Sequence, residues 1–241
     1  MNTGRQGLMA RGFIFGAAAL CGLAALLLFS RANQRQDTTL TTFKNPASIN
    51  MDTLRAKAEQ GEAQAQFQLG TLYAKGEGVT NSYVEASKWF GRAADQGNAE
   101  ARLALGELYE AGQGVPKDVG QAMSLYRQAA EQGSTRAQYT LGFLYEAGRG
   151  VPQNQVEAAN WFKRAAEHGD ALSQYDLGQR FELGVGVSID RTEALKWFVL
   201  AARQGQPDAA SRRDKLKKSM TRSEISEAER RADSFPTHSV R

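Results

Sequence analysis

The chain has few of the residues that form covalent cross-links or metal sites. Its 241 residues include one cysteine, Cys21, and two histidines, His168 and His238. One cysteine excludes an intramolecular disulfide, and these three side chains are too few for a typical structural zinc site. Glycine is frequent, at 24 residues, but shows no Gly-X-Y period, which excludes a collagen-like chain. We therefore expect neither a metal ion nor a cofactor.

Signatures of catalysis are absent too. The sequence contains no Gly-x-Ser-x-Gly, no His-Glu-x-x-His and no Gly-Lys-Ser/Thr. It also lacks the Ser-x-x-Lys and Lys-Thr-Gly motifs of enzymes that act on β-lactams. We expect a protein without enzymatic activity and without catalytic residues.

The net charge of +4 is distributed unevenly. Residues 1–50 carry +4, residues 51–210 carry −4 and residues 211–241 carry +4. Nucleic-acid-binding proteins usually have a basic stripe on the folded body, so the acidic body argues against a nucleic-acid partner. The basic run near the C-terminus indicates either a solvated helix face or a contact for anionic lipid headgroups or an acidic partner. This run consists of Arg212, Arg213, Lys215, Lys217 and Lys218.

Residues 13–29 form an uncharged apolar run of 17 residues behind a short basic N-terminus, residues 1–12. A helix of this run is about 25 Å long, near the lower limit for crossing a bilayer. A signal peptide has a shorter apolar region and a small-x-small cleavage site, so we favour a membrane anchor and keep a cleaved signal peptide as the alternative. The basic N-terminus is expected to stay in the cytoplasm, which leaves the body on the other side.

Two further expectations concern the N-terminal part. Gly12 and Gly16 have the GxxxG spacing that allows two membrane helices to pair, so a homodimer through them is one reading. The alternative is chance, because such spacing is common in runs rich in Ala and Gly. Residues 30–50 are rich in Thr, Asn and Gln and are expected to form a flexible linker.

From Gly61 onward the sequence repeats with a period of 36 residues. Each unit starts with a glycine and contains Leu-Gly, Gly-x-Gly-Val and Ala-Ala at fixed offsets, without an insertion. A period of this length is typical of a solenoid. The four complete units are residues 61–96, 97–132, 133–168 and 169–204.

Each unit is predicted to form two helices. In the first, Ala65, Leu69 and Leu72 share one face of a 3.6-residue period, and in the second Trp89 and Phe90 lie on the apolar face. The glycine after the first helix is expected to have a positive φ and to cap it, and the valine after the loop is expected to be buried. The glycines are Gly76, Gly112, Gly148 and Gly184, and the valines are Val79, Val115, Val151 and Val187.

A glycine inside the first helix indicates how the helices pack. Glycine there costs about 1 kcal/mol relative to alanine, so its presence in every unit indicates close approach of another helix. The large residues of the second helix are expected in the core. His168 stands where other units have glutamine, which favours a polar helix-end residue over a catalytic base. The glycines are Gly70, Gly106, Gly142 and Gly178, and the large residues are Trp89, Leu125, Trp161 and Trp197.

These motifs resemble the Sel-one-like repeats (SLR), relatives of the tetratricopeptide repeats. The resemblance covers residues 61–204, with Leu-Gly, Tyr-x-x-Gly-x-Gly-Val, Ala-x-x-Trp-Phe and Ala-Ala in order. It implies an all-α fold, a right-handed α-α superhelix with a concave, ligand-binding inner surface. Residues 51–60 resemble a half-repeat, so the solenoid is expected to span 51–204. Residues 205–235 resemble degenerate capping helices, and residues 236–241 are expected to be a disordered tail.

The resemblance also implies that the chain binds other proteins. We expect a noncatalytic scaffold of the cell envelope, single-pass in the bacterial inner membrane, with its body in the periplasm. Two alternatives stay open: a cell-wall or β-lactam-related hydrolase or binding protein of the same repeat family, and a periplasmic or secreted protein after signal cleavage. Neither the partner nor the pathway follows from the sequence.

The candidate contact surface lies on the first helices, away from their apolar stripe. Glutamates recur one repeat apart near the ends of these helices, and Phe143 is expected to be an exposed aromatic among polar positions. Aligned carboxylates would select a basic or amide-rich peptide, and Phe143 would provide an apolar anchor. The alternative is an ordinary solvated helix surface. The candidate residues are Glu107, Glu110, Arg136, Phe143, Glu146, Gln179 and Glu182.

Overall fold

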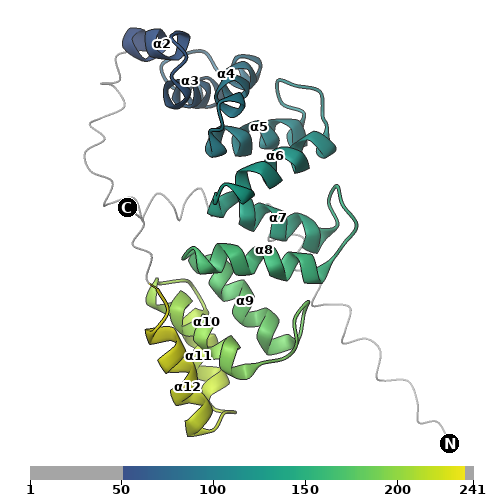
Figure 1. The fold of residues 1–241 in the computed structure, drawn as a ribbon, viewed down its shortest axis with the longest axis vertical. Helices are drawn as coiled ribbons and strands as arrows, with labels where there is room; N and C mark the ends of the chain where they lie inside the picture. Colours follow the sequence, from purple (N-terminus) through teal and green to yellow (C-terminus); the bar gives the residue numbers. More distant parts are fainter. Residues whose placement is uncertain (1–50, 237–241) are drawn as a thin grey trace, which may run out of the picture. The chain divides into compact units, whose positions relative to one another are not determined.

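The computed structural model describes residues 51–236 of the chain. These residues form eleven α-helices and no strand (Figure 1). The helices are α2 (Met51–Glu59), α3 (Ala63–Lys75), α4 (Tyr83–Asp95), α5 (Ala99–Ala111), α6 (Val119–Glu131), α7 (Thr135–Ala147), α8 (Gln155–Glu167), α9 (Ala171–Leu183), α10 (Arg191–Arg203), α11 (Ala209–Lys217) and α12 (Arg222–Asp233). The expected all-α class is confirmed.

Four helix pairs correspond to the four repeats: α3 with α4, α5 with α6, α7 with α8 and α9 with α10. The two helices of a pair pack on each other, and the second helix of each pair packs on the first helix of the next. Before the first pair, α2 packs on α3 as a lone second helix. Figure 1 shows the pairs following one another as a stacked array. The expected solenoid of helix pairs is therefore confirmed.

The expected membrane helix, residues 13–29, lies outside the described residues, and so do residues 30–50 and 237–241. Among the helices between Met51 and Pro236, none combines the length and the apolar character needed to cross a membrane. The anchor and the pairing of two anchors through glycines therefore stay predictions.

Side-chain caps begin the second helices, and glycines end the first ones. Each second helix of a pair starts after a residue whose side chain accepts a hydrogen bond from a backbone N–H of the first turn, as Ser82 accepts from Glu85. Each first helix ends at a glycine with φ between 67° and 73°. The N–H of Gly148, for example, donates to the carbonyl of Leu144. The expected left-handed glycine caps are confirmed.

The glycine inside each first helix lies against an aromatic ring of the second helix. A Cβ added to Gly142 would come within 2.8 Å of the Phe162 ring, closer than real Cβ contacts. The same contact, at 2.6–2.7 Å, recurs between Gly70 and Phe90, Gly106 and Tyr126, and Gly178 and Phe198. The expected close approach is confirmed, but the ring that makes it belongs to the residue after the tryptophan position.

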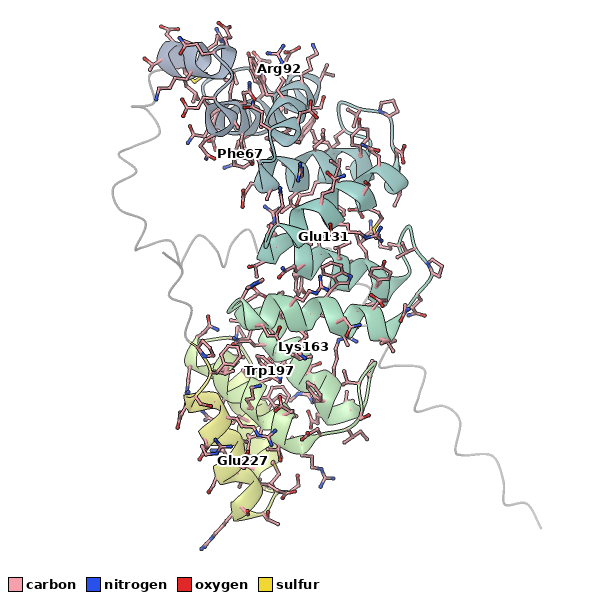
Figure 2. All side chains as sticks on the ribbon, viewed as in Figure 1. Phe67, Arg92, Glu131, Lys163, Trp197 and Glu227 are labelled. Carbon is pink, nitrogen blue, oxygen red and sulfur yellow. The ribbon has the colours of Figure 1, made fainter. Side chains whose placement is uncertain are left out.

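The tryptophan position itself belongs to the core in three units. Leu125, Trp161 and Trp197 are buried, as expected. Trp197, labelled in Figure 2, packs in one cluster with residues of α11 and α12. Trp89 in the first unit is only half-buried, and it packs at the edge of the N-terminal cluster.

In the second, third and fourth units, the second glycine of the Gly-x-Gly loop contacts the preceding unit. A Cβ on Gly186 would lie 1.9 Å from the carbonyl oxygen of Gln155 at the start of α8. A Cβ on Gly114 would lie 2.2 Å from the carbonyl carbon of Tyr83 at the start of α4. The loops of the second and fourth units thus lie against the backbone of the preceding unit, and the valines of all four loops touch only the edge of the core. The four valines are half-buried, so the expectation that they are buried is wrong: Val79, Val115, Val151 and Val187.

Both ends of the array differ from the internal units. In α2, Lys57 occupies the position at which all four second helices have a fully buried alanine, so the outer side of α2 suits water. At the other end α12 packs on α10, where Val199 and Leu200 are buried. An ion pair of 2.8 Å joins Arg231 of α12 to Glu193 of α10. These helices close the apolar ends of the repeat.

Candidate partner-binding face of the first helices

Ion pairs join three of the first helices, α5, α7 and α9, to the helix that occupies the same place one unit later. Glu107 of α5 pairs with Arg136 of α7 at 2.6 Å, and Glu182 of α9 pairs with Arg212 of α11 at 3.2 Å. We call the exposed or half-buried side of α3, α5, α7 and α9 that carries these residues the first-helix face. Besides the glutamates near the helix ends, it consists of Gln64, Gln68, Thr71, Glu100, Ala104, Glu107, Arg136, Thr140, Phe143, Leu172, Asp176 and Gln179.

A buried arginine makes the joint between α7 and α9. Arg180 pairs with Glu146 at 2.5 Å, and its side chain is only 6% exposed. The same guanidinium donates to the side-chain oxygen of Gln155 at 3.2 Å and lies 4.7 Å from the ring centre of Phe162. A buried cation needs such partners, because an unpaired charge in the interior is strongly unfavourable. Glu146 is therefore committed to holding two units together.

Glu110 is engaged as well. It accepts a hydrogen bond from the Tyr126 hydroxyl at 2.8 Å and pairs with Arg149 in the loop after α7, also at 2.8 Å. All four glutamates of the candidate site thus have cationic partners from a later part of the array. The aligned carboxylates of the candidate site are therefore already paired within the array, because stacking brings arginines of the following unit next to them. Whether this face binds another protein stays a prediction.

Burial shifts the titration of two carboxyl groups on this face. It raises the pKa of Glu107, in spite of the ion pair. Burial, with the negative charge of Glu146 nearby, raises the pKa of Asp176 to about 7, against the opposing effect of Arg180. Since Arg180 pairs with Glu146, Asp176 keeps no ion pair of its own among residues 51–236. Asp176 is therefore the carboxyl group on α9 best placed to gain from an external cation.

Phe143 is half-buried rather than exposed, while the next residue along α7 is buried in the core. The expectation of an exposed Phe143 is therefore wrong, although Phe143 is not among the buried core residues. Glu107 pairs with Arg136 between the second and third units. One repeat later, Phe143 stands at the position of Glu107 and Leu172 at the position of Arg136. We infer that these two apolar side chains are neighbours, with Gln179 two turns beyond Leu172 on the same helix.

A buried glutamine that the sequence pattern did not single out also connects units. The side-chain amide of Gln138 donates to the carbonyl of Ala130 at 3.0 Å, and its oxygen lies 2.9 Å from Nδ1 of His168. Gln66 and Gln174 make the same two contacts, with a glutamine in place of His168. His168 is the C-cap residue of α8, so its expected role at a helix end is confirmed. The 36-residue spacing of these glutamines was visible in the sequence, but their burial was not.

A shallow pocket of about 390 Å³ opens beside this contact. Arg164, Glu167 and His168 contribute to its lining, which is mainly polar. Small-molecule sites are usually more enclosed and more apolar than this. Within residues 51–236, no group of three or more His, Cys, Asp or Glu side chains is placed to hold a metal ion.

Four consecutive segments of the chain match the Sel1 repeat: residues 63–98, 99–134, 135–170 and 171–206. The chain belongs to the Sel1 repeat family. The matched segments begin at the first residue of each first helix, two residues after the glycines that mark the period. Sel1 repeat proteins are generally noncatalytic scaffolds for interactions between proteins.

Solved structures and one curated relative resemble the repeat array. A Sel1 repeat protein from Oxalobacter formigenes is 38% identical with a TM-score of 0.61, over 66% of this chain and 65% of that protein. A protective antigen present in uropathogenic Escherichia coli strains, with an SLR fold, is 28% identical with a TM-score of 0.46, over 76% of this chain and 47% of the antigen. The secretory immunoglobulin A-binding protein EsiB of Escherichia coli is 44% identical over 46 residues, which are 19% of this chain and 9% of EsiB. The chain thus matches less than two thirds of each relative.

Proposed function

We propose that this Sel1 repeat chain is a noncatalytic scaffold of the cell envelope, anchored in the bacterial inner membrane by residues 13–29 with its body in the periplasm. In this proposal the first-helix face binds another protein. The apolar run and the flanking charges support the anchor. The arrangement of the first helices supports the binding function.

The proposal is carried by a contrast between two kinds of position: framework positions, which hold each unit together, and surface positions on the first-helix face. The Leu-Gly and Ala-Ala pairs that hold each unit are the same in all four repeats. Directly after the framework glycine, in contrast, stand Thr71, Glu107, Phe143 and Gln179, which are all half-buried and chemically different. A rigid framework that presents different side chains in a fixed order favours recognition, because little conformational freedom is lost on binding.

The chemistry of the proposed partner follows from the side chains that remain available. Phe143 and Leu172 offer an apolar contact, and apolar or aromatic anchors usually carry most of the binding energy. Asp176, one turn beyond Leu172, offers a carboxyl group without an ion pair of its own. We therefore expect the partner to present a segment in which an apolar residue stands next to a lysine or arginine.

Pull-down from an envelope extract tests this proposal. Phe143→Ala removes the anchor, and Thr71→Ala changes the equivalent position of the first unit as a matched control. We expect partners to be lost with Phe143→Ala and retained with Thr71→Ala, while both variants keep the circular dichroism spectrum of the wild type. Replacing the four glutamates is a poorer test, because their ion pairs also hold the units together. Partners that Phe143→Ala retains at wild-type levels would mean that recognition lies elsewhere.

Cell fractionation with a C-terminal tag tests the anchor. We expect the chain in the inner-membrane fraction at its full length. A shortened, soluble periplasmic product would instead indicate a cleaved signal peptide, and a cytosolic product would overturn the proposed location.

A further inference from the structure

Two of the exposed large apolar side chains flank one loop, and a third lies on the helix that this loop touches. Within residues 51–236 four large apolar side chains are exposed: Val84 at 50%, Val156 at 56%, Leu183 at 59% and Ile189 at 66%. Leu183 and Ile189 flank the Gly-x-Gly loop of the fourth unit, and Val156 belongs to α8, which that loop touches. Single exposed apolar residues are common, but a group of them indicates an interaction site.

The packing of this loop brings the group together. A Cβ on Gly184 would lie 2.8 Å from Cγ1 of Ile189, so Ile189 folds back beside the end of α9. The backbone of Gly186 lies against Gln155 and Val156. A Cβ added to Gly186 would lie 3.1 Å from the backbone nitrogen of Val156. We call Val156, Leu183, Val185 and Ile189 the apolar edge; Val185, between the two glycines, is half-buried.

The repeat does not require apolar residues at these places. The equivalents of Ile189 include Asn81 and Gln153, whose side chains donate to carbonyl oxygens near the end of the preceding helix at 2.6 and 2.8 Å. An isoleucine cannot make this bond, so the fourth unit lacks a contact that stabilises the same loop in two others. The equivalents of Leu183 are lysine or alanine, and those of Val185 are glutamate, glutamine and arginine. Leu183, Val185 and Ile189 of the apolar edge therefore depart from the repeat, whereas Val156 has an equivalent valine, Val84, in the first unit.

Two lysines, Lys215 and Lys218, lie in the last turn and at the C-cap of α11. Glu182 precedes Leu183 and pairs with Arg212 of α11 at 3.2 Å. Since α10 returns between them, α9 and α11 run in the same general direction, and Lys215 lies one turn beyond Arg212 towards the loop. Lys215 and the helix-ending Lys218 are exposed and form no ion pair within residues 51–236, whereas Arg212, Arg213 and Lys217 are paired.

The geometry points to a membrane-docking surface: the apolar edge enters the interfacial region of an anionic lipid bilayer, and Lys215 and Lys218 contact the headgroup phosphates. Apolar side chains that protrude beside basic ones are suited to this region. A stable protein interface buries about 800 Å² on each partner, far more than four side chains provide, which disfavours a second copy or a partner protein here. This surface goes beyond the proposed partner-binding function and does not depend on it.

A fluorophore that senses its surroundings tests the docking on the full chain. In a Cys21→Ser background, we attach it to Ile189→Cys, and to Val84→Cys as a matched exposed position in the first unit. The proteins are reconstituted into vesicles of phosphatidylcholine alone or with phosphatidylglycerol. We expect a blue-shifted emission and protection from iodide quenching at position 189 in the anionic vesicles, and neither effect at position 84.

The contribution of the lysines has its own control. The double variant Lys215→Gln with Lys218→Gln is expected to lower the ratio of docked to undocked protein by about 30-fold at low ionic strength. This factor follows from the usual attraction of two lysines to anionic lipid. Lys88→Gln with Lys163→Gln removes the same charge from exposed positions elsewhere and should leave the signal unchanged. Unshifted emission at position 189 in anionic vesicles would overturn the proposal, and so would equal shifts at positions 84 and 189. A shift at 189 that needs added envelope proteins and no lipid would assign the edge to a protein instead.

Discussion

Two equivalent loop glycines provide a matched test of the joint between units. Gly78 and Gly186 occupy the same position in the first and fourth units, and both have a φ of 74°. A Cβ on Gly186 would lie 1.9 Å from the Gln155 carbonyl oxygen, whereas a Cβ on Gly78 would meet nothing closer than the Met51 sulfur at 4.0 Å. Alanine therefore adds the same backbone strain at both positions, but a collision with the preceding unit only at Gly186.

The difference can be given a magnitude. A left-handed φ costs a residue with a Cβ about 1–2 kcal/mol, which is the whole cost expected for Gly78→Ala. In Gly186→Ala the loop must also move about 1.5 Å away from α8 to restore a normal contact. Such overpacking costs a further ~1–3 kcal/mol. For a chain of this size, 1 kcal/mol corresponds to about 2–4 °C in Tm.

Thermal unfolding followed by far-ultraviolet circular dichroism measures the effect. We expect Gly186→Ala to lower Tm clearly more than Gly78→Ala does. Gly114→Ala repeats the test in the second unit, since a Cβ there would lie 2.2 Å from the backbone of Tyr83. An equal decrease in all three variants would refute the reasoning, because it would show that backbone strain alone explains the glycines.

Three further outcomes are expected. Trp161→Ala empties a buried position and should lower the free energy of unfolding by about 3–5 kcal/mol, so an unchanged Tm would contradict its place in the core. Gln138→Leu leaves the carbonyl of Ala130 without its side-chain donor and should cost about 1–3 kcal/mol in urea denaturation; a neutral result would make the glutamine contact dispensable. Burial raises the pKa of Asp176 to about 7 in the folded chain, whereas the unfolded chain loses this proton above about pH 4. This group therefore lowers the free energy of unfolding as the pH rises from about 4 towards 7. Asp176→Asn should therefore be more stable than the wild type at about pH 8 and equal to it at about pH 3, and a difference independent of pH would exclude titration of Asp176 as its cause.

The local parts of the fold could be predicted from the sequence. The helix ends follow from residues such as Gly148, whose left-handed cap depends only on the last turn of its own helix. The close approach at Gly142 could also be inferred, because a glycine kept inside a helix in every unit needs a packing reason. Which ring fills that space was not predictable in the same way: Trp161 and Phe162 are adjacent and both apolar, and the rotation of α8 about its own axis, which tertiary packing sets, decides between them.

The candidate site was predicted less well. The positions of Glu107, Glu146 and Glu182 on one face follow from the 36-residue period. Their ion pairs with Arg136, Arg180 and Arg212 do not, because each pair joins residues 29 to 34 positions apart whose separation depends on the angle between successive units. A sequence pattern shows which residues share a helix face, but it does not show whether a side chain of the next helix reaches that face.

The sequence by itself determined the number of units, their helix pairs and the chemical variation along the first helices, because each of these follows from a period of 36 residues and from contacts within a few turns. The tertiary structure alone decided which of those side chains remain available. Stacking pairs the glutamates with arginines and half-buries Phe143, and within residues 51–236 it leaves Asp176 without an ion pair. It also left Leu183 and Ile189 exposed, although both are as apolar as core residues, because no helix of the described part of the chain covers the loop that they flank.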